Sequence, residues 1–242
     1  MLRRERPLQC AGDDVPPTWL IAVAWISLAV AIGCAIVILA DIYVRGYRQQ
    51  MGIMEAVWPI TALYAGPVGL WAYWILGRPR SPRWRGEHAG ARPEQPYPVA
   101  VAIGVMHCGG GCTLGDIIGA TFVALVGLEI AGLALWPELV VDYALAFTLG
   151  IVFQYFSIAP MRDLGLREGV VAALKADALS LTAFEVGLFG WMIFVQLVLF
   201  PEQLHPGQAV YWLIMQIGML LGFVTAYPVN WWLIRVGLKE RM

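Results

Sequence analysis

Residues 98–135 read PVAVAIGVMHCGGGCTLGDIIGATFVALVGLEIAGLAL, an apolar stretch interrupted by a histidine, two cysteines and two acidic residues. One straight helix over this range would extend about 57 Å at 1.5 Å per residue, nearly twice the roughly 30 Å thickness of a bilayer core. The three consecutive glycines at 109–111 are poor helix formers. We therefore predict that the helix breaks at these glycines and that the break lines a site, because irregular backbone at membrane depth needs protein or water around it.

The rest of the chain also has the composition of a membrane protein. Of its 242 residues, 60% are hydrophobic and 14% are charged, and the mean hydropathy of +0.69 is too high for a typical soluble domain. The net charge of −1 gives no electrostatic reason to expect nucleic acid as a partner. Apolar runs of about 20 residues predict an all-α, polytopic transmembrane helical bundle in contact with lipid. The expected six spans are 18–40, 56–76, 98–135, 137–160, 176–200 and 209–234.

Short connections between the spans indicate one membrane domain without a separate soluble module. The N-terminal leader has no small-residue cleavage pattern, so we interpret the first span as a retained helix rather than a signal peptide. Prolines and glycines mark the segment between the second and third spans as a linker. The predicted segments are a cytoplasmic basic leader at 1–17, two helices at 18–76, an Arg/Pro-rich cytoplasmic loop at 77–97 and a four-span domain at 98–242.

Lysines and arginines gather in loops that fall on one side of a six-span chain. Because cytoplasmic loops carry an excess of these residues, we predict that both termini lie in the cytoplasm. Arg45 and Arg48 are the exceptions, since a six-span path places them on the opposite side. The basic clusters are Arg3, Arg4 and Arg6; Arg78, Arg80, Arg83, Arg85 and Arg92; Arg162, Arg167 and Lys175; and Lys239 and Arg241.

The segment from His107 to Asp116 is the main candidate site. An ionisable group at membrane depth costs at least about 2.5 kcal/mol on insertion scales, so such groups usually serve a function. If the helix stays intact, Cys108, Cys112 and Asp116 recur every fourth residue and share one face. Thiolate, thioether and imidazole groups suit Cu(I), with Zn(II) as the second choice. The predicted metal ligands are His107, Cys108, Cys112, Asp116, Met215 and Met219.

Packing is the alternative explanation for part of this pattern. Gly111, Gly115 and Gly119 form a small-residue stripe that lets another helix approach closely, in the same chain or in a second copy of it. Methionine is also a common filler of apolar cores, so Met215 and Met219 alone favour packing. The glycines therefore leave a homo-oligomer open as a further partner.

Acidic residues in other spans are candidates for ion coupling. Asp177 and Glu185 fall near one helical face of the fifth span, and Glu129 lies toward the outer end of the third. Asp177 sits close enough to the predicted interface that pairing with Lys175 or another basic residue is an equal alternative. Glu185 lies two turns deeper, which favours a functional role.

These residues favour a protein that binds or transports a small cation, with Cu(I) preferred, and a transporter is favoured over an enzyme. The first alternative is a thiol-redox protein that uses Cys108 and Cys112, although its spacing differs from the usual Cys-x-x-Cys. The second is a structural or assembly subunit without transport activity. No Gly-Lys-Ser/Thr loop for phosphate binding occurs in the sequence, which argues against direct use of ATP.

Residues 98–242 resemble an uncharacterised family of bacterial integral membrane proteins that is known only as a domain of unknown function. The resemblance implies a bacterial inner-membrane protein, and it implies no reaction, substrate or ligand set. The segments that carry it are 107–119 (HCGGGCTLGDIIG), 153–161 (FQYFSIAPM), 175–185 (KADALSLTAFE), 215–219 (MQIGM) and 227–234 (YPVNWWLI).

Overall fold

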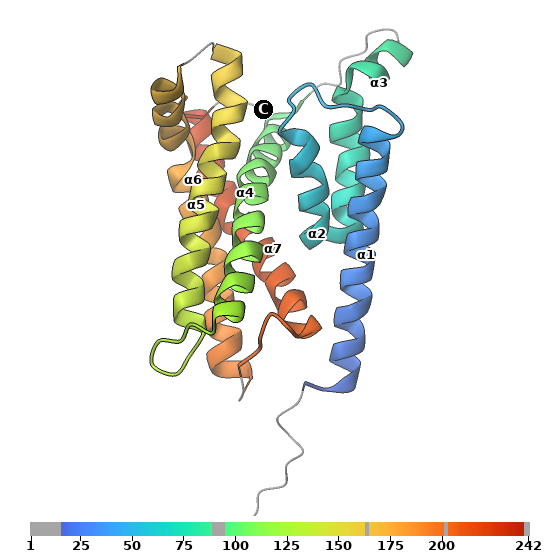
Figure 1. Ribbon diagram of the computed structural model, residues 1–242. Coiled ribbons are helices and arrows are strands. Elements are labelled where there is room, and N and C mark those ends of the chain that lie inside the picture. The colour runs from blue at the N-terminus through green and yellow to red at the C-terminus, as the bar shows by residue number, and fades with distance from the viewer. Residues whose placement is uncertain (1–15, 89–94, 163–164, 201–202, 240–242) are drawn as a thin grey trace, which may run out of the picture.

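The structure, a computed structural model, describes residues 16–88, 95–162, 165–200 and 203–239 as long helices packed side by side (Figure 1). Within these ranges there are helices, loops and one isolated bridge, and no strand. The predicted all-α bundle is therefore confirmed. The helices are α1 (Thr18–Tyr43), α2 (Met54–Ala72), η1 (Tyr73–Gly77), η2 (Arg78–Arg80), α3 (Pro82–Glu87), α4 (Tyr97–Val126), α5 (Leu135–Arg162), α6 (Leu166–Phe194), η3 (Val195–Leu199) and α7 (Ala209–Arg235).

Six segments of the described chain are long and apolar enough to cross a membrane by length and composition. They agree in number with the predicted spans, and their bounds differ mainly at α6, which begins at Leu166 instead of 176, and at α4, which ends at Val126 instead of 135. Almost all of the predicted basic leader at 1–17 lies outside the described residues.

The second apolar segment folds back on itself at Gly66. Along a straight helix Trp58 and Tyr73 would be about 22 Å apart, yet their rings meet edge to face with centroids 5.8 Å apart. Residues 54–65 and 67–77 are therefore the antiparallel arms of a helical hairpin. In Figure 1 the hairpin enters and leaves at the same end of the bundle.

Local backbone chemistry explains this turn. Gly66 has φ 52° and ψ −128°, which glycine adopts far more readily than other residues, and Pro67 has no N–H with which to continue a helix. Gly69 lets the arms approach, since a Cβ there would lie 2.9 Å from Ala62 Cα. Each arm extends roughly 16–18 Å, about half of a bilayer core. The segment expected to cross at 56–76 is thus apolar as predicted, but it forms a re-entrant hairpin.

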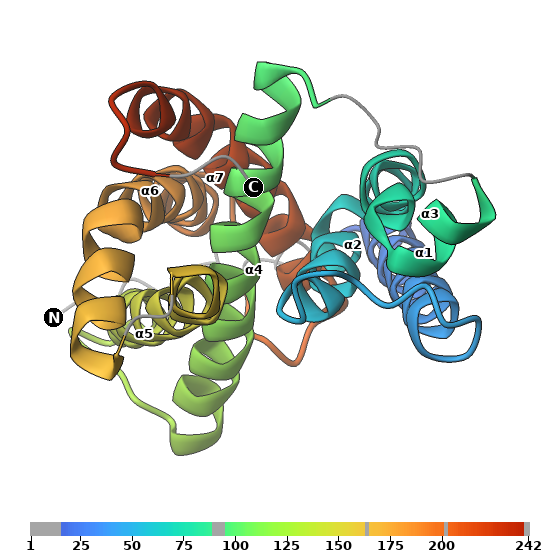
Figure 2. The same ribbon diagram turned by 90° about the horizontal axis from the view of Figure 1, so that it is seen from above.

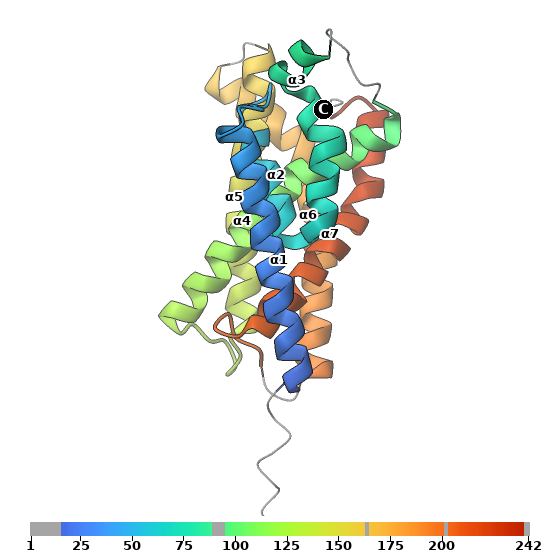
Figure 3. The ribbon, with the colours of Figure 1, turned by 90° about the vertical axis from the view of Figure 1, so that its right-hand side faces the viewer.

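The hairpin changes the order in which the chain crosses the bundle. Ser27 in the first half of α1 donates a hydrogen bond to Gln216 in the first half of α7 at 2.7 Å, so these two helices start at the same end. Both end at the opposite side, where Tyr97 at the start of α4 donates to the carbonyl of Trp231 at 2.8 Å (Figures 1 and 3). The first and last described residues therefore lie at opposite ends, and the prediction of both termini on one side does not fit this fold.

The third span is an unbroken helix, and the prediction of a break at 109–111 is wrong. α4 runs from Tyr97 to Val126 and ends at Gly127, whose φ of 70° is left-handed. The residues that follow form the turn into α5, which explains why the apolar stretch is too long for one crossing. Figure 2 shows α4 passing obliquely through the bundle, so its 30 residues cover less membrane depth than an upright helix would.

Close packing against α5 keeps the glycines of α4 helical. A Cβ on Gly111 would lie 2.6 Å from Gly150 Cα, and one on Gly115 would overlap the backbone of Ala146. This contact compensates for the weak helix propensity of glycine, about 1 kcal/mol per residue. The glycine stripe is buried inside the chain, so this face is not free to join a second copy.

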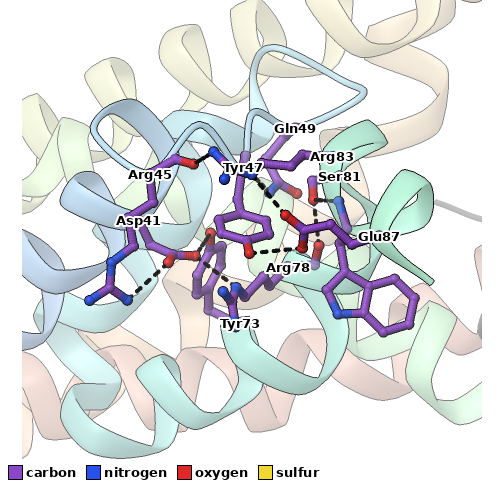
Figure 4. A network of polar contacts seen from close by, with 10 residues as sticks. Asp41, Arg45, Tyr47, Gln49, Tyr73, Arg78, Ser81, Arg83 and Glu87 are labelled. Atoms are coloured by element: carbon purple, nitrogen blue, oxygen red, sulfur yellow. Dashed lines mark hydrogen bonds and ion pairs between the residues drawn. The ribbon is translucent and has the colours of Figure 1, made fainter.

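A polar network holds the second arm of the hairpin to the end of α1 (Figure 4). The buried Asp41 accepts a hydrogen bond from Tyr73 Oη at 2.9 Å and pairs with Arg78 at 3.2 Å. In the following loop, Tyr47 donates to Glu87 of α3 at 3.0 Å. The loop after α1 and the segment after the hairpin therefore lie at one end of the bundle.

Candidate functional site

One face of α4 carries the polar residues singled out from the sequence. Cys108, Cys112 and Asp116 follow each other at one-turn intervals, and each is 0% exposed. The expectation that an intact helix places them on one face is confirmed. Their surroundings divide them into two groups, which we call the Lys239 network and the acidic cluster.

The Lys239 network lies at the end of the bundle where α7 ends. Lys239 Nζ donates to Asp177 Oδ1 at 2.5 Å and to Asn230 Oδ1 at 2.7 Å. It also lies 3.3 Å from the carbonyl oxygen of Gly104 and 3.6 Å from Cys108 Sγ. Burial acts to lower the pKa of Lys239, but the adjacent Asp177 carboxylate raises this pKa above its ordinary value. The ammonium therefore stays charged inside the protein.

Ser180 connects this network to the Cys108 thiol of α4. Cys108 Sγ lies 2.9 Å from Ser180 Oγ, which accepts a hydrogen bond from Asn230 Nδ2 at 2.5 Å. The network thus joins α4, α6 and α7. Asp177 pairs with Lys239 and not with Lys175, whose side chain is exposed.

The acidic cluster consists of Asp116 on α4, Glu138 and Asp142 on α5, and Glu185 on α6. Their side chains belong to residues that are 0% to 4% exposed. The charges of the other three act on Asp116. Asp142 also lies directly against α4, since a Cβ on Gly119 would overlap its Oδ1. Three helices therefore bring four carboxyl groups together inside the bundle.

Most oxygens of this cluster lack a partner in the part of the chain that the structure describes. Both oxygens of Asp116 accept no hydrogen bond there, and neither does Asp142 Oδ1, while the thiol of Cys112 is the neighbour of Glu185. Glu138 accepts a hydrogen bond from Tyr211 Oη. The ion pairs found among the described residues include none of the four. Four ionised carboxylates buried together would repel one another strongly, so the cluster needs protons or a bound cation.

The soft donors of the predicted metal site do not converge. His107 turns toward α5, with Nε2 3.0 Å from Ser157 Oγ. Cys108 belongs to the Lys239 network, whereas Cys112 lies next to Glu185. Among the described residues, no three His, Cys, Asp or Glu side chains are arranged to hold a metal ion. The structure therefore brings Cys112 to the acidic cluster and separates the other soft donors from it.

The methionines of α7 border a separate cavity. Met215 and Met219 line a largely apolar space of about 400 Å³ between α1, α4 and α7, together with Thr113 and Gln216. Gln216 Nε2 donates to the carbonyl of Leu63 at 2.7 Å, close to the turn of the hairpin. The cavity thus lies beside the tip of the re-entrant hairpin.

Sequence reasoning misplaces one acidic residue and misses two others. Glu129 is exposed in the turn between α4 and α5 and lies outside the cluster. Glu138 and Asp142 are cluster members that the sequence analysis does not select. They are four residues apart and share a face of α5, and the carboxyl group of Asp142 within an apolar span is the signal that would have found them.

The part of the chain that contains the Lys239 network and the acidic cluster matches a known protein family. A family model described as Domain of unknown function (DUF4396) matches residues 99–239, more than half of the chain. This confirms the resemblance inferred from the sequence motifs. The match spans α4 to α7 and leaves out α1 and the hairpin. No curated protein and no solved structure matches the chain.

Proposed function

We infer that this chain, which belongs to the family described as Domain of unknown function (DUF4396), moves a small cation across a membrane through the acidic cluster. The observation that supports this most directly is the burial of four carboxyl groups, at most 4% exposed, with no cation paired to any of them and no partner for either oxygen of Asp116 among the described residues. Ionisable groups at membrane depth are costly and commonly mark ion pathways and proton relays.

The proton is the cation that fits this cluster best. Two like charges about 4 Å apart repel by about 4 kcal/mol at an effective dielectric constant of 20. A proton removes one of these charges and needs a single oxygen, whereas a hard metal ion needs several oxygens in one coordination shell. Carboxyl groups on three helices that share protons provide successive binding positions.

Cu(I) and Zn(II) are the alternatives to the proton. Cys112 offers a soft donor beside Glu185 and near Asp116, so a metal bound there would have mixed thiolate and carboxylate ligands. The other soft donors would have to rotate or move to join it. A metal site at this position therefore requires a rearrangement, which a proton does not.

The other two hypotheses have less support. For thiol-redox chemistry, Cys108 and Cys112 are both free thiols, and each faces a different neighbour, Ser180 and Glu185 respectively. A purely structural role accounts for the glycine stripe on α4, but it leaves the unpartnered carboxyl groups without a reason.

The re-entrant hairpin is consistent with transport. Helices that end or turn inside the membrane expose backbone groups, and they persist where those groups line a site or a water-filled space. Here Leu63 presents its carbonyl to Gln216 beside the cavity. The hairpin therefore covers this cavity from one side of the membrane, while the cavity lies toward the other.

We further propose that the end of the bundle with the Lys239 network faces the cytoplasm of a bacterial inner membrane. Cytoplasmic loops carry most of the lysines and arginines. With the hairpin in place, Arg45 and Arg48 join the other described basic residues at this end, whereas Arg3, Arg4 and Arg6, which lie outside the described residues, precede the opposite end of α1. This orientation places the end of α7 inside and the start of α1 outside. The described basic residues at this end include Arg45, Arg48, Arg78, Arg80, Arg83, Arg85, Arg167, Lys175, Arg235 and Lys239.

Proton flux into liposomes tests the proposed function. The purified full-length protein is reconstituted with a pH-sensitive dye inside the vesicles, and flux is driven by a potassium–valinomycin potential. We expect Asp116→Asn and Glu185→Gln each to reduce the flux at least tenfold. Glu129→Gln removes an exposed carboxyl group and should leave the flux unchanged. Equal flux in wild type, both cluster variants and empty vesicles would refute proton transport.

Metal content distinguishes the soft-metal alternative. Wild type and the Cys108→Ser/Cys112→Ser double variant are exposed anaerobically to Cu(I) and, separately, to Zn(II), and bound metal is counted by mass spectrometry. The proton proposal expects no stoichiometric metal in either protein. One metal ion per chain that is lost in the double variant would favour the soft-metal site instead.

A further inference from the structure

We propose that the space between Gly104, Asp177 and Asn230 is a binding site for an ammonium-type cation, and that Lys239 occupies it as a tethered ligand. The three oxygens around Nζ lie at 2.5 Å, 2.7 Å and 3.3 Å, and Cys108 Sγ lies at 3.6 Å. An ammonium group has three N–H donors, which matches the three oxygens. The site is formed by α4, α6 and α7, while its occupant comes from the segment that follows α7.

Bonds that do not involve Lys239 orient two of the three acceptors of this site, Asn230 and Gly104. The side-chain nitrogen of Asn230 donates to Ala226 O at 2.9 Å and to Ser180 Oγ. These two bonds turn the side-chain oxygen of Asn230 toward the site. Ser180 in turn lies against Cys108 Sγ. Gly104 presents a backbone carbonyl, whose direction is set by the helix. The orientation of Asn230 and of the Gly104 carbonyl is therefore independent of the ammonium.

The occupant reaches the site through a reversal of the chain. α7 ends at Arg235, and Gly237 has φ 77°, a left-handed conformation that turns the following residues back toward the bundle. Lys239 is consequently buried, although it comes four residues after the helix end. The backbone N–H groups of Leu238 and Lys239 both donate to the carbonyl of Leu233, so this turn holds the tether against the end of α7.

The second carboxylate oxygen of Asp177 is free to accept a hydrogen bond from a further donor. Oδ2 of Asp177 is buried and has no hydrogen-bond partner among the described residues, whereas Oδ1 binds Lys239. A free cation with a fourth donor, such as ammonium, could use both oxygens. Ammonium and methylammonium are the ligands that this chemistry fits. Methylammonium reproduces the last carbon and nitrogen of the lysine side chain.

The charge of the tethered ammonium also affects the proposed cation path, and this step rests on the proposed function. Cys108 of this network and Cys112 beside the acidic cluster are one turn apart on the same face of α4. The Lys239 network therefore stands between the acidic cluster and the end of the bundle where α7 ends. A positive charge held there repels other cations and closes this end of the path.

Chemical rescue tests the site without any measurement of transport. Lys239→Ala in the full-length protein removes the ammonium and leaves Asp177 buried without a partner, so the melting temperature in detergent should fall by several degrees. Methylammonium or ammonium at 1–50 mM, on the order of the weak affinity that small cations have for single sites, should restore it in a saturable manner. Tetramethylammonium has no N–H donor and should not. Wild type, whose site is filled, should not respond.

Two further variants make the result decisive. Lys239→Ala/Asp177→Asn removes both charges and should fold but show no response to methylammonium. Lys239→Met keeps the bulk of the side chain in the site and should not be rescued either. If Lys239→Ala is too unstable to purify, recovery only in the presence of methylammonium supports the site. Absence of rescue by both amines while the double variant folds would overturn it, as would an equal shift in wild type.

The closure of the cation path by the Lys239 ammonium is tested separately, by measuring proton flux. In liposomes, Lys239→Ala should raise proton flux severalfold, and methylammonium should bring it back toward the wild-type rate. Rescue of melting without any effect of Asp116→Asn on flux would retain the site and refute the proposed function. An effect of Asp116→Asn on flux without rescue of melting would retain the proposed function and refute the ammonium site.

Discussion

Trp58 and Tyr73 are 15 residues apart in the chain, yet their rings lie edge to face with centroids 5.8 Å apart. This contact exists only because the chain reverses at Gly66. It converts an apolar segment of spanning length into a re-entrant hairpin. It also moves the loop that follows α1 to the same end of the bundle as α3, so the whole membrane topology depends on it.

Labelling from outside the cell tests this topology. Single cysteines at Gln50, Gly86 and Glu129 are introduced into a chain whose native cysteines are replaced, and intact cells are treated with an impermeant maleimide. All three positions are exposed. The hairpin predicts the same labelling for Gln50→Cys and Gly86→Cys and the opposite for Glu129→Cys. A six-span chain instead groups Gln50→Cys with Glu129→Cys, and this pattern would contradict the hairpin.

Replacement of Gly66 should destabilise the hairpin itself. Gly66→Ala forces a Cβ onto a residue with φ 52°, where we expect a loss of about 1–2 kcal/mol. The matched control is Gly33→Ala in α1, where the backbone is helical and no atom lies within 4 Å of the new Cβ. Thermal unfolding in detergent compares the two variants. Equal melting temperatures would show that the turn at Gly66 is not required.

Hydropathy predicts the bundle well and the hairpin poorly. A run of about 20 apolar residues has the same composition whether it crosses the membrane once or turns halfway. The information needed was local: Gly66 followed by Pro67 is a strong turn signal. Arg45 and Arg48, which conflicted with the six-span topology, were a second indication of the reversal. Their conflict disappears when the hairpin is included.

For the glycines of α4 the error is the opposite one, because the sequence predicts a break where the helix is continuous. Propensity alone favours a break at 109–111, but the backbone of Gly150 and Ala146 on α5 lies so close that only glycine fits at Gly111 and Gly115. Tertiary packing of this kind is not visible in one sequence. The same holds for the site, where Lys239 and Asp177 are 62 residues apart and meet only after α6 and α7 have packed.

A larger residue at Gly115 should separate α4 from α5. Its Cβ would overlap the Ala146 backbone, so Gly115→Ala must shift one helix against the other, and we expect a loss of about 1–3 kcal/mol. Gly86→Ala on the exposed surface of α3 has free space around it and should cost less than about 0.5 kcal/mol. Melting curves of the two variants, recorded side by side, measure the difference. A neutral Gly115→Ala would mean that these helices do not pack as closely as described.

The hydroxyl of Tyr211 should stabilise the protein through Glu138 alone. Tyr211→Phe removes one hydrogen bond to a buried carboxyl group while the ring remains, so we expect a loss of about 1–3 kcal/mol. Tyr143→Phe is the control, because its hydroxyl bonds to Thr182 on the exposed surface and should matter little. In a double-mutant cycle, Tyr211→Phe should cost much less when Glu138 is already replaced by Ala. If the cost is unchanged in that background, the tyrosine acts through another neighbour and Glu138 is held in the acidic cluster by other contacts.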